Sequence, residues 1–249
     1  MKKRAAVLLL IFVFISCEKP SDCIESSGKT VFKEISVNTF SRIKVYRGIE
    51  VIITDGAIYK VEIEAGENFI NDIEVTQIGD QLIFKEQATC NWVRDYGKTK
   101  IHITTPTLYE IYSKTDRNIS SNGVLTYPDL SVLSLDIDAD GESGAGTGDF
   151  HLQVQNNSLS IYNNNVSRFF LSGTTNLASL NFYFGDGRIK AENLIAQKIT
   201  VFHRGSNDMF VTAIQSIEGV LNSTGNLFIT TTPPIVNIQE LYHGRVIFL

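Results

Sequence analysis

Three aspartates at alternate positions are, by type and spacing, the side chains of this chain best suited to hold a metal ion. Asp136, Asp138 and Asp140 match the first positions of a calcium-binding loop. Such a loop needs a bidentate glutamate at its twelfth position, which here is Thr147. We therefore expect the three carboxylates to alternate outward from a strand into solvent, with bound calcium as the weaker alternative and no cofactor.

Residues able to do acid–base or nucleophilic chemistry are scattered along the chain. The segment Gly141 to Ala145 resembles a nucleophile elbow but lacks its second glycine. The acids Asp149, Asp186 and Asp208 fall at predicted turns, where aspartate is common. No pair of the histidines has the spacing of zinc ligands; they are His102, His151, His203 and His243. We expect no catalysis.

Aromatic side chains are the remaining indication of binding. Strand alternation predicts outward positions for Tyr109, Tyr112, Tyr162 and Tyr183, and also for Tyr127 and Phe202. Aromatic rows on one face suit contacts with a glycan or a protein. Cross-strand stacking that stabilises a sheet would produce the same pattern and is the simpler explanation.

The N-terminus predicts export. A basic start, Lys2 to Arg4, precedes an apolar run that ends at Ser16-Cys17. The run is too short to cross a bilayer core of ~30 Å as a helix. We interpret residues 1–16 as a lipoprotein signal peptide, Cys17 as the lipid attachment site and residues 17–30 as a polar tether. The alternatives are a signal peptide cleaved elsewhere and a short membrane anchor.

The net charge of the chain limits the classes of partner that we expect, and its cysteines predict a disulfide. The net charge is −5, and removing residues 1–16 would make it more negative, which argues against nucleic acid and against electrostatic binding to anionic lipid. The membrane partner would then be reached through the lipid on Cys17. In an exported protein we expect Cys23 and Cys90 to form a disulfide, with two free thiols as the alternative.

The elements that must position these residues are strands. Helical periodicity is nearly absent after residue 17, whereas short alternating runs separated by turn residues are frequent. Gly79-Asp80 lies between two such runs and predicts a two-residue hairpin. Residues 31–105 are thus expected to be β-structure with some antiparallel pairing.

From residue 108 onward a unit of about 20 residues repeats. Each unit has three positions spaced i, i+3 and i+5 that are mostly apolar, with Ile or Leu at the middle position in all seven units; a polar turn and a second apolar stretch follow. The middle positions, which we expect to point inward, are Ile111, Leu133, Leu159, Leu180, Ile199, Ile217 and Ile238. Stacked units would bury these side chains in one column, as in a parallel β-solenoid. A sandwich with evenly spaced strands is the alternative.

The chain resembles the DUF2807 family, Bacteroidetes lipoproteins described as auto-transporter adhesins with a head GIN domain. The resemblance rests on Phe40 to Tyr46, Val61 to Asn68, Cys90 to Arg94, and Lys100 to Pro106. It implies an all-β, right-handed, single-stranded parallel β-helix over residues 31–249, shaped like pectin-lyase solenoids but without their catalytic set. One departure is clear. Many relatives have Ser-Gly-Ser-Gly where this chain has Ser113 to Asp116.

The expected function is adhesion or binding by an outer-membrane lipoprotein on the cell surface or the periplasmic face, with a glycan or surface protein as ligand. A glycan-acting enzyme and a structural envelope protein are the alternatives. The last apolar stretch, Val246 to Phe248, would leave an open strand edge, through which we expect two copies to pair.

Overall fold

The computed structural model describes residues 27–87, 99–136, 141–142, 144 and 146–249, which form an all-β chain. These residues contain no helix that could span a membrane. Their strands are β1 (Thr30–Ile35), β2 (Arg42–Val45), β3 (Glu50–Asp55), β4 (Lys60–Gly66), β5 (Ile73–Ile78), β6 (Gln81–Glu86), β7 (Lys100–Thr105), β8 (Glu110–Ser113), β9 (Ile119–Leu125), β10 (Asp129–Ser134), β11 (Phe150–Asn163), β12 (Arg168–Phe182), β13 (Arg188–His203), β14 (Met209–Leu221), β15 (Leu227–Ile229), β16 (Ile235–Glu240) and β17 (Val246–Phe248).

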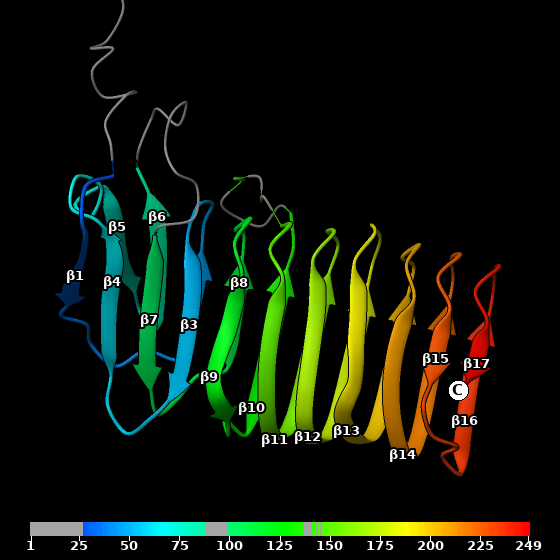
Figure 1. The fold of residues 1–249 in the computed structure, drawn as a ribbon. Coiled ribbons are helices and arrows are strands. Elements are labelled where there is room, and N and C mark those ends of the chain that lie inside the picture. The colour runs from blue at the N-terminus through cyan, green and yellow to red at the C-terminus, as the bar shows by residue number, and fades with distance from the viewer. Residues whose placement is uncertain (1–26, 88–98, 137–140, 143, 145) are drawn as a thin grey trace, which may run out of the picture.

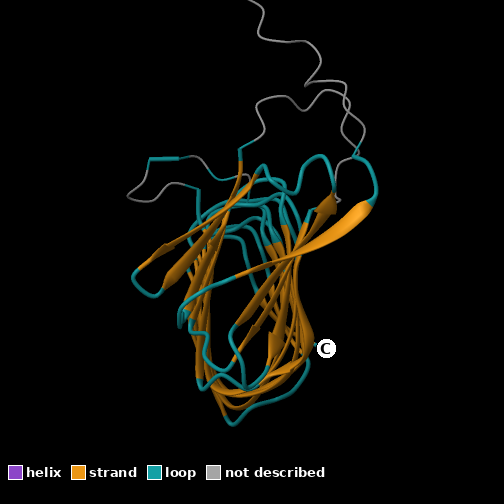
Figure 2. Cartoon of the chain, turned by 90° about the vertical axis from the view of Figure 1, so that its left-hand side faces the viewer, coloured by secondary structure: helices purple, strands orange, loops and turns teal. Residues whose placement is uncertain are grey.

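The strands form two rows that join through the long strands β11 to β14 (Figure 1). One row runs β5-β6-β2-β8-β10, then the second halves of β11 to β14, then β16. The other runs β1-β4-β7-β3-β9, then the first halves of β11 to β14, then β15 and β17. Seen from the side of β1, the rows are two layers that converge at one edge (Figure 2).

From β8 and β9 onward every pairing is parallel, and we call this region the parallel array. Its interior is a set of apolar columns, each built from one side chain of every successive strand. One column consists of fully buried residues in register: Phe150, Phe169, Ile189, Met209 and Leu227. Phe150 and Phe169 stack at 4.6 Å between ring centroids. A single unit could not bury such a side chain alone, so the array depends on stacking.

The N-terminal end differs because its sheet is mixed. The pairs β1–β4, β4–β7 and β5–β6 are antiparallel, so the antiparallel pairing expected within residues 31–105 is confirmed. The predicted hairpin is also confirmed, since Ile78 pairs with Gln81 around Gly79, whose φ is +62°. Hydrogen bonds from Arg42 and then Ser41 hold this turn against β2 and lower the pKa of Asp80 to about 2.

The predicted single column of repeat residues is wrong in register. Ile111, Leu180 and Ile238 do share one inward column, together with Val132, Ile161, Val201 and Gly219. Leu159, Ile199 and Ile217 belong to the neighbouring inward column, two residues away along the strands. Leu133 points outward between Tyr112 and Tyr162. In this row β10, β11, β12 and β13 each bury two apolar positions, so a pattern of apolar residues alone cannot choose between them.

Stacking is close where the long strands bend. Gly173 pairs with Val154, has a φ of +103°, and a Cβ atom built on it would lie 2.0 Å from the Val154 carbonyl oxygen. Only glycine fits a left-handed conformation that brings two backbones this close.

Where β11 and β13 end, the array buries polar side chains that form hydrogen bonds with the backbone of the following turns. The amide of Asn163 closes a small ring with the backbone of Asn165. The His203 side chain is fully buried; its Nδ1 accepts from the Gly205 amide and its Nε2–H donates to the Asn207 carbonyl. Burial lowers the pKa of His203, which keeps the ring neutral.

Several residues with a predicted role lie outside the part of the chain that the structure describes. Cys17, Cys23, Cys90, Asp138 and Asp140 lie outside the described residues, as do the signal peptide and most of the tether. Asp136 is described but follows the end of β10 and is half-buried, its amide bound to Asn164. It therefore does not alternate outward on a strand as expected.

Strands β16 and β17 carry exposed apolar side chains at Ile235, Val236 and Phe248, and the residues that follow these strands add Leu241, Tyr242 and Leu249. Apolar side chains exposed on an edge strand favour pairing with another strand. Association of two copies through this edge stays a prediction.

Candidate functional site

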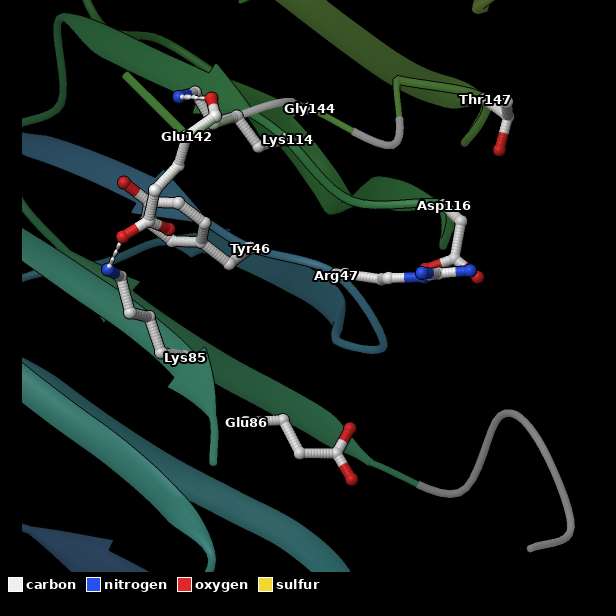
Figure 3. Close-up of a pocket in the computed structure, with 9 residues that line it drawn as sticks. All are labelled: Tyr46, Arg47, Lys85, Glu86, Lys114, Asp116, Glu142, Gly144 and Thr147. Atoms are coloured by element: carbon white, nitrogen blue, oxygen red, sulfur yellow. Dashed lines mark hydrogen bonds and ion pairs between the residues drawn. The ribbon is translucent and has the colours of Figure 1, made fainter. Parts of the chain in front are cut away.

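A pocket of about 700 Å³ lies at the carboxyl ends of β6, β2 and β8 (Figure 3). We call it the Tyr46 pocket. Its lining is polar and comes from four separate segments of the chain: Tyr46, Arg47, Lys85, Glu86, Lys114, Asp116, Glu142, Gly144 and Thr147. Since β6, β2 and β8 are neighbours in one row, side chains far apart in the sequence meet here.

Strand alternation places these side chains on the outer face of the row. Ile43 and Val45 of β2 point into the core, so Lys44 and Tyr46 point away from it. On the flanking strands Lys44 pairs with Ile83 and Tyr112. Backbone hydrogen bonds extend both pairings past the end of β2, from Tyr46 to Phe84 and from Lys114 to Val45. The next cross-strand row is therefore Lys85, Tyr46, Lys114.

Three ammonium groups converge on the Tyr46 ring. The Nζ atoms of Lys85, Lys44 and Lys114 lie 4.3, 5.4 and 5.5 Å from its centroid. Lys44 and Lys114 also lie 5.0 and 5.9 Å from the Tyr112 ring. These distances are within the range of cation–π attraction, which strengthens when the cation is desolvated. Lys114 is only 1% exposed and Lys44 only 8% exposed, so two of the cations are nearly out of water.

Glu142 lies across the mouth of this cluster. Its carboxylate pairs with Lys85 at 2.6 Å, and its backbone carbonyl accepts a hydrogen bond from Lys114 Nζ at 2.5 Å (Figure 3). On the other side of the pocket Asp116 accepts from the Gly48 amide at 2.8 Å. The pocket thus has one end where Lys85 and Lys114 lie, and an opposite end where acceptor oxygens lie beside the Arg47 guanidinium.

The side chains of this pocket are of types that recognise ligands. Lysine ammonium groups and tyrosine rings recognise anions and polar ligands by charge and hydrogen bonds. Among the described residues no group of three or more His, Cys, Asp or Glu side chains could hold a metal ion.

The aromatic residues predicted to bind do not form one surface. Tyr112 is the one that reaches the Lys44–Lys114 cluster, although it is 6% exposed. Tyr109 and Tyr183 are exposed, and Tyr162 and Phe202 are half-buried on the outer face of the parallel array.

Tyr127 was expected outside but is buried, and its hydroxyl donates to the Thr105 carbonyl. Burial raises the pKa of Tyr127 well above its usual range. Its position at the bend after β9, where the chain turns inward, explains the error.

The most regular aromatic row was not predicted. His151, Phe170, Lys190, Phe210 and Phe228 are in register on the outer face of successive strands, and we call them the aromatic ladder. His151 and Phe170 stack at 4.6 Å, and Phe210 and Phe228 at 4.7 Å, with nearly parallel planes. Stacked rings turn their faces to each other and only their edges to solvent. The ladder therefore fits the structural explanation, although a pocket of about 480 Å³ lies beside it.

The sequence contained one signal for the Tyr46 pocket. Lys114 and Asp116 fall in the segment Ser113 to Asp116, where the sequence departs from the expected family pattern. Lys44, Tyr46 and Lys85 could not be found by spacing, because only the parallel pairing of β6, β2 and β8 brings them together.

Comparisons with known proteins agree with the fold. The DUF2807 family model, described as "Putative auto-transporter adhesin, head GIN domain", matches residues 39–233. A putative adhesin from Bacteroides fragilis is 22% identical, with a TM-score of 0.78 over 90% of this chain and 100% of that one. A putative lipid binding protein from Parabacteroides distasonis is 15% identical, with a TM-score of 0.60 over 88% and 97%. A putative adhesin from Parabacteroides merdae is 17% identical, with a TM-score of 0.57 over 89% and 97%. No curated protein matches the chain.

Proposed function

Because this chain belongs to the DUF2807 family, we propose that it is an exported, lipid-anchored envelope protein that binds a glycan or a surface protein through the Tyr46 pocket, without catalysis. The observation that carries the proposal is the convergence of Lys44, Lys85 and Lys114 on one tyrosine ring at the wall of a pocket of about 700 Å³. Pockets of this size with a few convergent polar groups are typical binding sites.

The names of the structural neighbours support a binding role of this kind. Two of these three neighbours are named as adhesins and one as a lipid binding protein. A lipid chain would need an apolar cavity. Among the described residues, a mainly apolar pocket around Tyr109 and Tyr127 encloses about 200 Å³, below the ~300 Å³ at which small-molecule sites begin. The polar Tyr46 pocket fits an adhesin better.

The scaffold proposed for this site is a right-handed, single-stranded parallel β-helix with an antiparallel N-terminal end. Parallel registers that recur once per unit through the array support this winding. Strand-to-strand crossovers are right-handed in nearly all proteins. A crystal structure would test it, and a left-handed crossover between β12 and β13 would refute it.

Binding can be tested with the mature full-length protein, fluorescently labelled and incubated with a glycan array, host cells and envelope fractions. We expect saturable binding that Lys85→Gln weakens. The matched control is Lys190→Gln, which removes a lysine over an aromatic ring of the ladder, 5.3 Å from Phe210, and leaves the pocket intact. Saturable binding that both variants reduce equally would place the site elsewhere, and absence of binding to every target would refute the function.

The anchor is a separate part of the proposal. Replacing Cys17 by Ala in the full-length protein should release it from the membrane fraction and abolish incorporation of labelled fatty acid. Protease treatment of intact cells would then report whether the array faces outward. Unchanged membrane association of Cys17→Ala would contradict lipid anchoring.

A glycan-cleaving enzyme is the second candidate, and Glu110 is the observation that favours it. Burial raises the pKa of Glu110, while on the same face hydrogen bonds lower that of Asp80. Glycosidases use two carboxyl groups whose surroundings push their pKa values in opposite directions. Asp80, however, is occupied by Arg42 and Ser41 in the turn between β5 and β6. Release of reducing ends from polysaccharides that Glu110→Gln abolishes would establish this alternative.

A further inference from the structure

We propose that the Tyr46 pocket takes the carboxylate of an acidic saccharide, with that carboxylate at the lysine end and the sugar hydroxyls at the opposite end. This inference rests on the proposed binding function and names its ligand class.

The lysine end supplies the positive charge. Lys44, Lys85 and Lys114 come from strands β2 and β6 and from the residue after β8, and all three ammonium groups lie within 5.5 Å of the Tyr46 centroid. Lys85 and Lys114 line the pocket itself, and Lys44 adds its charge from beside the ring. Like charges brought together raise the local positive potential, most of all where burial reduces screening by solvent. The whole chain is acidic, with a net charge of −5, so this end of the pocket stands out from the rest of the molecule.

Preorganisation makes these cations suited to an anion. Lys114 is 1% exposed, and its Nζ is fixed by the carbonyl of Glu142. Lys85 is one-third exposed and reaches the same residue from the other side, through its carboxylate. An incoming carboxylate could replace the Glu142 carboxylate beside Lys85 and gain charge-assisted hydrogen bonds from donors already in place.

The opposite end of the pocket argues against a simple or a polyvalent anion. Glu86 and Asp116 line it with carboxylates and Thr147 with a hydroxyl, and the Arg47 guanidinium lies beside Asp116 (Figure 3). The two carboxylates outnumber the single guanidinium, so this end does not favour a chain of phosphates, whereas its oxygens accept hydrogen bonds from hydroxyl groups. One carboxylate and several hydroxyls, held within about 700 Å³, describe a sugar acid such as a uronic acid.

Titration calorimetry on the mature protein tests the inference, with glucuronate, glucose and sodium sulfate as probes. We expect glucuronate to bind about ten-fold more tightly than glucose, which is ~1.4 kcal/mol. Sulfate should bind more weakly than glucuronate, and raising the salt concentration should weaken glucuronate binding because ions screen the lysines. Lys85→Gln should reduce glucuronate affinity about five-fold or more, while glucose affinity stays within error.

Two further variants make the result decisive. Lys190→Gln should leave glucuronate binding unchanged. Lys114→Gln, checked by thermal unfolding to be folded, should weaken glucuronate binding at least as much as Lys85→Gln. Equal affinity for glucuronate and glucose, or sulfate binding as tight as glucuronate, would overturn the acidic-saccharide assignment. If cells or glycans are still bound in the glycan-array experiment, the binding function survives that failure; if they are not, both fail.

Discussion

Aromatic and basic side chains meet both in the aromatic ladder and in the Tyr46 pocket, and their geometry differs. In the ladder the rings stack in two pairs at 4.6 and 4.7 Å, so each of these rings has another ring as a neighbour, and Lys190 lies between the pairs. In the Tyr46 pocket, Lys85 and Lys114 flank Tyr46 across the strands, so the ring meets cations in place of another ring. The same residue types therefore stabilise the sheet in one place and form a polar pocket in the other. Position in the register decides between these roles.

If this contrast is correct, changes in the parallel array should lower stability and leave ligand binding intact. Phe169 is fully buried and stacks on Phe150 and against Phe182. Phe169→Ala should lower the free energy of unfolding by about 3–5 kcal/mol, because it removes a large core ring and leaves a cavity. Urea denaturation would measure this loss. The neighbouring Phe170→Ala, in the ladder on the outer face, should cost about 1 kcal/mol. Equal losses would mean that the aromatic ladder contributes as much to the free energy of unfolding as the core does.

The close stacking at the bends predicts the next largest effect. Gly173→Ala should cost about 2–4 kcal/mol, because it strains a positive φ and forces a Cβ against the Val154 carbonyl. Gly123→Ala is the matched control, since Gly123 also has a positive φ of +90° but nothing within 4 Å of its Cβ position. It should cost only about 1 kcal/mol. If both variants unfold at the same urea concentration, the close approach of the strands at Gly173 does not determine the cost of adding a Cβ atom there.

The pocket should respond in the opposite way. Lys85→Gln should change the free energy of unfolding by less than about 1 kcal/mol, because its ion pair with Glu142 is partly exposed to water. The same substitution should weaken ligand binding. A loss of more than about 3 kcal/mol would show that the lysine cluster is structural, like the ladder.

The smallest effect should come from pH, through the buried polar corner of the array. Burial lowers the pKa of His203 in the folded chain below the value of about 6.5 expected when unfolded. Well above pH 6.5 the ring is neutral in both states and its contribution to stability is complete. As the pH falls below 6.5, the unfolded chain takes up a proton before the folded one, so stability decreases. Thermal unfolding from pH 7.5 to 5 should show this slope, and His203→Gln should reduce it. An unchanged slope in the variant would assign the effect to other groups.

The sequence alone predicted the kind of structure well. Alternation, turn residues and the absence of helical periodicity indicated an all-β chain, which is confirmed. The hairpin at Gly79 was correct because turn residues act locally. The family was also identified from short segments, and the family model supports it.

Register and contacts between strands were decided only by the tertiary structure. Leu133 was placed inside and Tyr127 outside, and both assignments were wrong, because a shift of one residue moves a side chain to the other face. Spacing in the sequence could not predict the Tyr46 pocket, since Tyr46, Lys85 and Lys114 are neighbours only across parallel strands. Local sequence thus determined which residues form strands and turns. The stacking of those strands determined which of their side chains meet, because that depends on pairing between distant segments.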